Sequence, residues 1–173
     1  AKLFNLNYTG GALDLYKCFD QLSRELLQEL LTAAGAPPSI IAAYMDYHSK
    51  LTVYNSMAQG IGKGYHKALS IPQGCPFSMC FVALLLRPWI CRMRTRPGAQ
   101  PRILADDLLL VQNGGEDHLE DFYAAFTDTQ QYLIDIGSKI STSKSFLFST
   151  NNLVRGELAT KFWEPINAKL GVQ

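Results

Sequence analysis

Two adjacent aspartates, Asp106 and Asp107, are the residues whose types and spacing point most directly to chemistry. They lie between two short apolar runs in the stretch 101–111, and turn-forming residues, Pro101 and Gly114, mark the outer ends of these runs. Runs of this length predict the strands of a tight β-hairpin with the aspartates at its tip. Two charges there cost desolvation free energy unless a cation neutralises them. From this stretch alone, a metal site and a simple turn, in which Asp bonds its own backbone, are equally supported.

A third carboxylate, Asp14, lies in the apolar segment 12–19, which predicts a strand. If that strand neighbours the hairpin, three carboxylates converge on one edge of a small sheet. Such a cluster repels itself unless cations intervene, and ligation by oxygen alone favours magnesium or manganese over zinc. Two such ions are a common device for phosphoryl transfer, because one activates the attacking oxygen while the other stabilises the leaving group.

The surrounding pattern predicts the elements that position these residues. Helical spacing of apolar residues, with capping and stop residues, predicts helices from Asp20 or Ser23 to Gly35, from a Ser39 cap through His48, from Ser78 to a kink or end at Pro88, over 116–136 and over 156–170. Asp20 is assigned to helix capping. Ile40, Ile41, Tyr44 and Tyr47 are expected on the inner face of the second helix. Strands are predicted over 51–58, 65–71 and 145–149, the first two joined around Gly60–Gly64. This order predicts an α+β domain with helices on one face of an antiparallel sheet.

The composition suits a folded domain and excludes several other classes. The 173 residues are 47% apolar with a net charge of +1, enough for one domain or one domain with a short appendage. Five arginines fall within 87–102, a stretch without acidic residues, and indicate either a phosphate-binding surface or a solvated face. The four cysteines and three histidines lack zinc-site spacing, which favours reduced cysteines in an intracellular protein of unassigned compartment. The longest apolar run, 77–86, is too short to span a bilayer.

Four segments together resemble the palm motifs of reverse transcriptases. They are 14–20 (DLYKCFD), 70–78 (SIPQGCPFS), 104–107 (LADD) and 137–145 (GSKISTSKS). Each is weak alone, but their order and spacing are specific, and they span most of the chain. The interval between the first two resembles non-LTR retroelement and group II intron enzymes more than retroviral ones. The resemblance therefore implies a polymerase palm, a ferredoxin- or RRM-like antiparallel sheet, with partial fingers.

The resemblance also assigns roles to residues. It implies that Asp14, Asp106 and Asp107 hold two Mg²⁺ ions, for which Mn²⁺ can substitute. Phe19 matches the aromatic steric gate that excludes a ribose 2′-hydroxyl, while Gln73 and Gly74 match the loop against the incoming nucleotide. Lys144 matches a lysine that protonates the departing pyrophosphate. Taken alone, Phe19 would be a core side chain and Lys144 a solvated loop residue.

The implied organisation is a palm with partial fingers over 1–150, with about 21–70 as a fingers or palm insertion, and an extension over 151–173 that begins a thumb. The expected partners are an RNA template, a DNA or RNA primer, dNTPs and the missing fingers and thumb segments, with no membrane. Because the chain begins without Met and only thirteen residues precede Asp14, we expect a fragment.

The implied activity is RNA-directed DNA polymerisation, and two alternatives remain open. An RNA-dependent RNA polymerase usually has a polar residue near Phe19 and Gly where Ala105 stands. A catalytically incomplete palm that only binds nucleic acid would fit the missing fingers but not the three acids. The chain also departs from the motifs at Leu104, where an aromatic residue is usual, and at Met79, where Pro is common.

Overall fold

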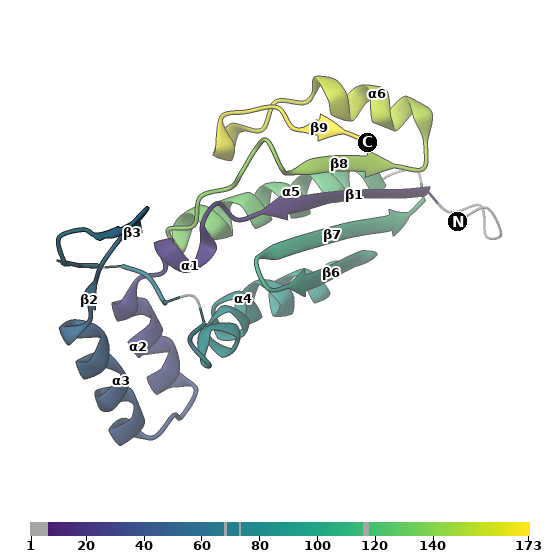
Figure 1. Ribbon diagram of the computed structural model, residues 1–173. Coiled ribbons are helices and arrows are strands. Elements are labelled where there is room, and N and C mark those ends of the chain that lie inside the picture. The colour runs from purple at the N-terminus through teal and green to yellow at the C-terminus, as the bar shows by residue number, and fades with distance from the viewer. Residues whose placement is uncertain (1–6, 68, 73, 116–117) are drawn as a thin grey trace. The chain divides into compact units, whose positions relative to one another are not determined.

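Figure 1 shows the computed structural model, which describes residues 7–67, 69–72, 74–115 and 118–173. Contacts divide the chain into two units, residues 1–18 with 86–173 and residues 19–85. The helix α4 (Ser78–Arg94) contributes to both. In the described part of the chain, no helix combines the length and apolar character that a membrane span requires.

The first unit is built on a five-stranded sheet in the order β6-β7-β1-β8-β9. The strands are β1 (Asn7–Asp14), β6 (Ala99–Leu104), β7 (Asp107–Gly114), β8 (Phe146–Ser149) and β9 (Gly171–Val172). All pairs are antiparallel except β8 with β9. The predicted hairpin over 101–111 and the strand over 145–149 are confirmed, as is the α+β class.

One face of this sheet carries the core. Burial alternates along β7 and β8, so that every second side chain is buried beneath the helices. The helix α5 (His118–Asp135) packs on β1 and β7, and the Trp89 indole of α4 donates a hydrogen bond of 2.9 Å to Thr129 of α5. Fully buried side chains fill this layer: Leu13, Leu86, Trp89, Met93, Leu108, Leu110, Phe122, Phe126, Leu133, Leu147 and Trp163.

The other face of the sheet is open to solvent. Its residues belong to the alternate register positions, and all of them except Gly10 are half-buried or exposed. They are Gln100, Arg102 and Leu104 on β6, Asp107, Leu109, Val111 and Asn113 on β7, Tyr8, Gly10, Ala12 and Asp14 on β1, and Phe146 and Phe148 on β8. The helices packed on the sheet therefore lie on one side, as the sequence predicted, and Asp14 and Asp107 lie on the other.

The glycine pair Gly10-Gly11 lies inside β1, although the sequence placed it before the strand. A Cβ atom on Gly10 would come within 2.3 Å of the Phe148 ring, and one on Gly11 within 2.3 Å of the Phe126 ring. Both faces of β1 thus need bare backbone, because an aromatic ring lies directly on each. The strand also ends at Asp14 rather than continuing to Phe19.

Two further predictions in this unit are wrong in part. Pro88 does not end α4, which continues to Arg94, since burial of Leu86, Trp89 and Met93 outweighs the ~3 kcal/mol cost of an interior proline. The tail forms α6 (Asn152–Thr160), capped by Asn151, then a 3₁₀ turn, η1 (Glu164–Ile166), and β9, instead of one helix over 156–170. The long helix before Gly137 is confirmed as α5, while residues 116–117 lie outside the described part.

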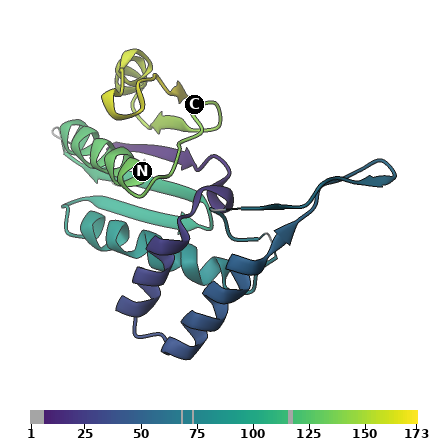
Figure 2. The same cartoon turned by 90° about the vertical axis from the view of Figure 1, so that its left-hand side faces the viewer.

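The second unit contains α2 (Arg24–Ala33), α3 (Pro38–Lys50) and a ribbon over 52–66, and Figure 2 shows this ribbon as a long, narrow hairpin. Two short ladders form the ribbon, β2 (Thr52–Val53) with β5 (Tyr65–His66) and β3 (Ser56–Met57) with β4 (Gly60–Ile61). The predicted hairpin is therefore confirmed in outline, but its strands are shorter and end before Ile71.

The helix caps of this unit differ from the sequence predictions. Ser23 caps α2 by accepting a hydrogen bond from the backbone of Leu26, whereas Asp20 lies inside a single turn, α1 (Cys18–Gln21), and pairs with Lys67 at 2.9 Å. α3 begins at Pro38 without a side-chain cap, so Ser39 is not its cap. Its inner face is formed by Ile41 and His48, while the side chains of Ile40 and Tyr47, which were expected inside, are exposed.

Candidate active site

Two of the predicted carboxylates face each other across neighbouring strands. Asp14, the last residue of β1, is the Cα partner of Asp107, the first residue of β7. Side chains at directly opposed positions lie on the same face, with Cβ atoms roughly 5 Å apart, and like charges in that arrangement are destabilising. This local cost indicates that the pair is suited to a positively charged ligand rather than to sheet stability.

The third carboxylate lies in the turn between β6 and β7. Ala105 and Asp106 form a two-residue connection, since Leu104 pairs with Asp107. Ala105 has φ +55°, in the left-handed region that favours glycine. Strain of this kind, of order 1–3 kcal/mol, persists where the surroundings fix the backbone and is concentrated at functional sites. The tight turn keeps Asp106 directly beside Asp107.

The end of β1 is fixed by the segment that follows α5. The Asp14 backbone N–H donates to Ser145 Oγ at 3.1 Å, and that hydroxyl donates to the Ser141 carbonyl at 2.8 Å. The Ser141 N–H in turn donates to the Asp14 carbonyl at 2.9 Å. Both backbone groups of Asp14 are therefore held by this loop, which keeps the carboxylate at one position on the sheet edge.

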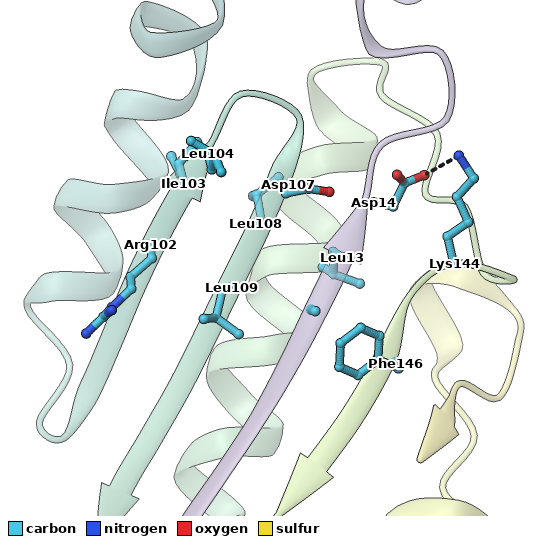
Figure 3. Close-up of a pocket in the computed structure, with 11 residues that line it drawn as sticks. Leu13, Asp14, Arg102, Ile103, Leu104, Asp107, Leu108, Leu109, Lys144 and Phe146 are labelled. Atoms are coloured by element: carbon cyan, nitrogen blue, oxygen red, sulfur yellow. Dashed lines mark ion pairs between the residues drawn. The ribbon is translucent and has the colours of Figure 1, made fainter. Parts of the chain in front are cut away.

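A cation from the same loop lies beside the carboxylate pair. Lys144 Nζ is 3.8 Å from Asp14 Oδ2, and Figure 3 shows this ion pair with Asp107 on the other side of Asp14. The Lys144 side chain is 70% exposed, so the pair contributes at most about 1 kcal/mol and leaves the lysine free to reorient. An open cavity of about 560 Å³ lies in front of these residues, with Arg102, Leu104 and Phe146 in its lining.

The negative charge of Asp106 affects the buried Cys18 thiol on the core side of this sheet edge. Burial raises the pKa of the Cys18 thiol to about 11, and the negative charge of Asp106 adds to the rise. Asp106 is itself half-buried, whereas Asp107 is exposed. The carboxylates therefore differ in environment, with Asp14 and Asp107 opening on the cavity.

The carboxylate oxygens at this sheet edge are the type of ligand that hard divalent cations prefer. Asp14 and Asp107 offer opposed carboxylate oxygens on one face, and Asp106 is the next residue along the chain. As the side chains stand, no three His, Cys, Asp or Glu donors within the described residues are close enough together to hold one ion. A cation bound at this edge would offset the mutual repulsion of Asp14 and Asp107.

The other residues singled out by the sequence belong to the second unit. Phe19 is half-buried at its start, and Gly74 lies in a turn with φ +91°. That φ gives a backbone reason for glycine at this position, separate from any close approach of a ligand. Gln73 lies outside the described residues. The structure thus brings Asp14, Asp107 and Lys144 together, with Asp106 adjacent in the turn.

Two contributors to the site were not identified from the sequence. Ser145 was predicted only as the start of a strand, and the Ser141–Ser145 spacing offered a weak sign of a backbone-holding pair. Arg102 was considered only as a member of the arginine cluster. Residues two apart on a strand share a face, so its spacing from Leu104 would have placed Arg102 on the same face as the carboxylates.

Comparisons with known proteins identify the family and the fold. A family model described as reverse transcriptase (RNA-dependent DNA polymerase) matches residues 7–163, whereas no curated protein matches. A structure of telomerase from Candida tropicalis in complex with a TWJ fragment of telomeric RNA is similar with a TM-score of 0.65 and 12% identity, covering 84% of this chain and 26% of that one. A structure of apo telomerase from the same organism, truncated from its C-terminal domain, is similar with a TM-score of 0.58 and 14% identity. That match covers 84% of this chain and 31% of the telomerase chain.

These structural likenesses concern the fold, because the identities are low, and the chain spans under a third of either telomerase chain. They agree with the antiparallel-dominated sheet and the helices described above, which form a polymerase palm. The family model covers nearly the whole length, including the paired aspartates and the loop that holds Asp14. The chain belongs to the reverse transcriptase family.

Proposed function

We propose that this chain is the catalytic palm of an RNA-directed DNA polymerase that extends a primer by nucleotidyl transfer. The observation that carries the proposal is the register pairing of Asp14 with Asp107, with Asp106 in the adjoining turn. In the reaction the primer 3′-oxygen forms a bond to the α-phosphorus of a dNTP. The bond from that phosphorus to the β-phosphate oxygen breaks, and pyrophosphate leaves.

Asp14, Asp106 and Asp107 would hold two Mg²⁺ ions, for which Mn²⁺ can substitute. Bound there, the metals would supply activation of the 3′-oxygen and charge stabilisation at the α-phosphate. The protein's part is to hold the carboxylates at one sheet edge through β1, β7 and the Ser145 hydroxyl. Lys144, which is exposed and near Asp14, would donate a proton to the departing pyrophosphate.

Three further residues would supply the nucleotide contacts. We assign to Phe19 the exclusion of a ribose 2′-hydroxyl and to Gln73 and Gly74 the contact with the incoming nucleotide. Residues 21–70 would belong to the fingers and 151–173 to the start of the thumb. By the interval between its first two motifs, we place the chain with non-LTR retroelement and group II intron enzymes. Its partners would be an RNA template, a DNA or RNA primer and further fingers and thumb segments, in an intracellular setting.

Primer extension on an RNA template with Mg²⁺ tests this proposal. We expect dNTP incorporation that falls at least about 100-fold in Asp14→Asn and Asp107→Asn, because each removes a carboxylate that would hold the metal ions. Asp121→Asn, at an exposed position on α5, is the matched control and should retain activity.

Three outcomes would separate the alternatives. Incorporation of rNTPs instead of dNTPs would contradict the role of Phe19 and indicate an RNA polymerase. Full activity in Asp107→Asn would contradict the carboxylate site. Duplex binding without extension, even when residues preceding Ala1 are supplied, would indicate a palm that only binds nucleic acid.

A further inference from the structure

The five arginines between residues 87 and 102 do not form one surface. Arg92 and Arg96 both bind the Asp128 carboxylate of α5, so their charge is already neutralised in part. The side chains of Arg87, Arg94 and Arg102 make no hydrogen bond or ion pair with any described residue. Of these three, Arg102 lines the cavity in front of the carboxylates, and the other two do not.

Arg102 has a defined place on the carboxylate face. It is the Cα partner of Leu109, and Leu104, two residues on, is the partner of Asp107. Two residues of strand span about 7 Å, so the Arg102 backbone lies roughly that far along β6 from the hairpin tip. Its side chain is exposed, and in Figure 3 its guanidinium points away from Asp107 and Asp14.

The two cations at the cavity lie on opposite sides of the carboxylates. Arg102 is on β6, Lys144 follows β1 on the β8 side, and Asp107 and Asp14 lie between them, as the strand order and Figure 3 show. Between the cations, Ala12, Leu109 and Phe146 form an apolar floor. A ligand that satisfies this arrangement carries phosphates at separated points and presents apolar surface, such as sugar and base edges, between them.

We infer that Arg102 binds a backbone phosphate of the primer strand, which lies on this apolar floor with its 3′ end at the carboxylates. The inference rests on the proposed polymerase function and adds a direction to it: primer on the β6 side and triphosphate on the Lys144 side. An arginine suits the task, since its planar guanidinium donates two parallel hydrogen bonds to one phosphate.

Equilibrium binding tests the inference without any need for turnover. A fluorescein-labelled DNA primer annealed to an RNA template is titrated with protein at several salt concentrations, and anisotropy gives Kd. Arg102→Gln should weaken binding about tenfold, and the slope of log Kd against log salt should fall by about 0.9, the value for one lost phosphate contact. Arg102→Lys should restore much of the slope but less of the affinity.

The matched control is Arg94→Gln, which removes the same charge from an exposed position outside the cavity. It should change Kd less than twofold. Equal weakening by both substitutions would overturn the inference, because a general electrostatic field would then explain binding. Unchanged binding in Arg102→Gln, or no duplex binding by the parent chain, would overturn it as well. Unchanged thermal unfolding midpoints would show that the variants fold.

The source of the phosphate is distinguished by steady-state extension. The primer assignment predicts that Arg102→Gln raises KM for the duplex while KM for dNTP stays within twofold. A rise for dNTP alone would place the triphosphate at Arg102 and overturn the direction. Loss of extension in Asp107→Asn with normal Arg102→Gln binding would leave the polymerase proposal intact and reject only this one. Duplex binding that depends on Arg102, in a chain that cannot extend a primer, would support the role of Arg102 and reject the polymerase proposal.

Discussion

The two units of the chain are stabilised in different ways. In the first, β1 pairs with β7 and β8, strands about a hundred or more residues away in sequence, and two tryptophans are completely enclosed. In the second, neighbouring segments pair with one another, as α2 with α3 and β2 with β5. The ribbon there leaves Met57 and Ile61 more than three-quarters exposed.

The difference shows where the chain can position chemistry. A carboxylate on β1 is fixed by non-local register, which a local fluctuation does not alter. Segments with few buried contacts open at low free energy, and moving parts of binding sites are drawn from such segments. The proposed metal ligands all belong to the first unit, and the proposed nucleotide contacts, Phe19, Gln73 and Gly74, belong to the second.

The largest expected effect is on the first unit, through Gly11. In Gly11→Ala the new methyl group must displace the Phe126 ring, and we expect a loss of about 3 kcal/mol in unfolding free energy. Both tryptophans of the chain lie in the first unit, so urea denaturation followed by their fluorescence reports on it. Gly156→Ala, where nothing lies within 4 Å of a new Cβ, is the control and should be neutral or slightly stabilising. A neutral Gly11→Ala would mean that the sheet repacks freely.

A smaller effect is expected at Ser145, which links the strand that carries Asp14 to the following loop. Ser145→Ala removes a hydrogen bond to the Asp14 N–H and one to the Ser141 carbonyl, at a cost of about 1–2 kcal/mol in unfolding free energy. Because the carboxylate position then loosens, primer extension should fall further than stability alone explains, and Ser145→Thr should recover part of it. Ser143→Ala, in the exposed part of the same loop, should leave both quantities unchanged.

Local patterns were sufficient to predict the hairpin over 101–111 and the helix α5. Apolar spacing, turn residues and a terminal glycine lie within each of these segments, so their sequence alone carries the information. The convergence of three carboxylates was predicted only on the condition that the strand of Asp14 lies next to the hairpin. Non-local register decides that condition, and the Asp14–Asp107 pairing meets it.

The wrong predictions also depend on contacts between residues that are far apart in the sequence. The role of Gly10-Gly11 depends on the rings of Phe126 and Phe148, more than a hundred residues away, so a glycine pair that signals a turn locally lies inside a strand. Pro88 remains helical because of burial on α4, which no local propensity reveals. Arg102 and Ser145 become visible as site residues only after β6, β1 and the loop are placed together.

The smallest effect is expected in the second unit and depends on pH. His48 is buried, with neither ring nitrogen hydrogen-bonded to any described residue, and burial together with the nearby Arg24 guanidinium lowers its pKa below the usual 6.5. The unfolded chain therefore takes up this proton more readily than the folded chain. Stability that is present above pH 6.5 falls as the pH drops towards the lower folded-state pKa, by at most about 1.4 kcal/mol per pH unit.

Urea denaturation at pH 7.5 and 5.5 checks this, with far-UV circular dichroism to detect the helices of both units and tryptophan fluorescence to detect the first alone. His48→Phe keeps a ring against Tyr44 and has no proton to gain, so the acid-sensitive part of the dichroism transition should disappear. His66→Phe, on the exposed ribbon, should leave it in place. An equal loss at low pH in the fluorescence transition would show that the two units unfold together, and the contrast between them would then not extend to their stability.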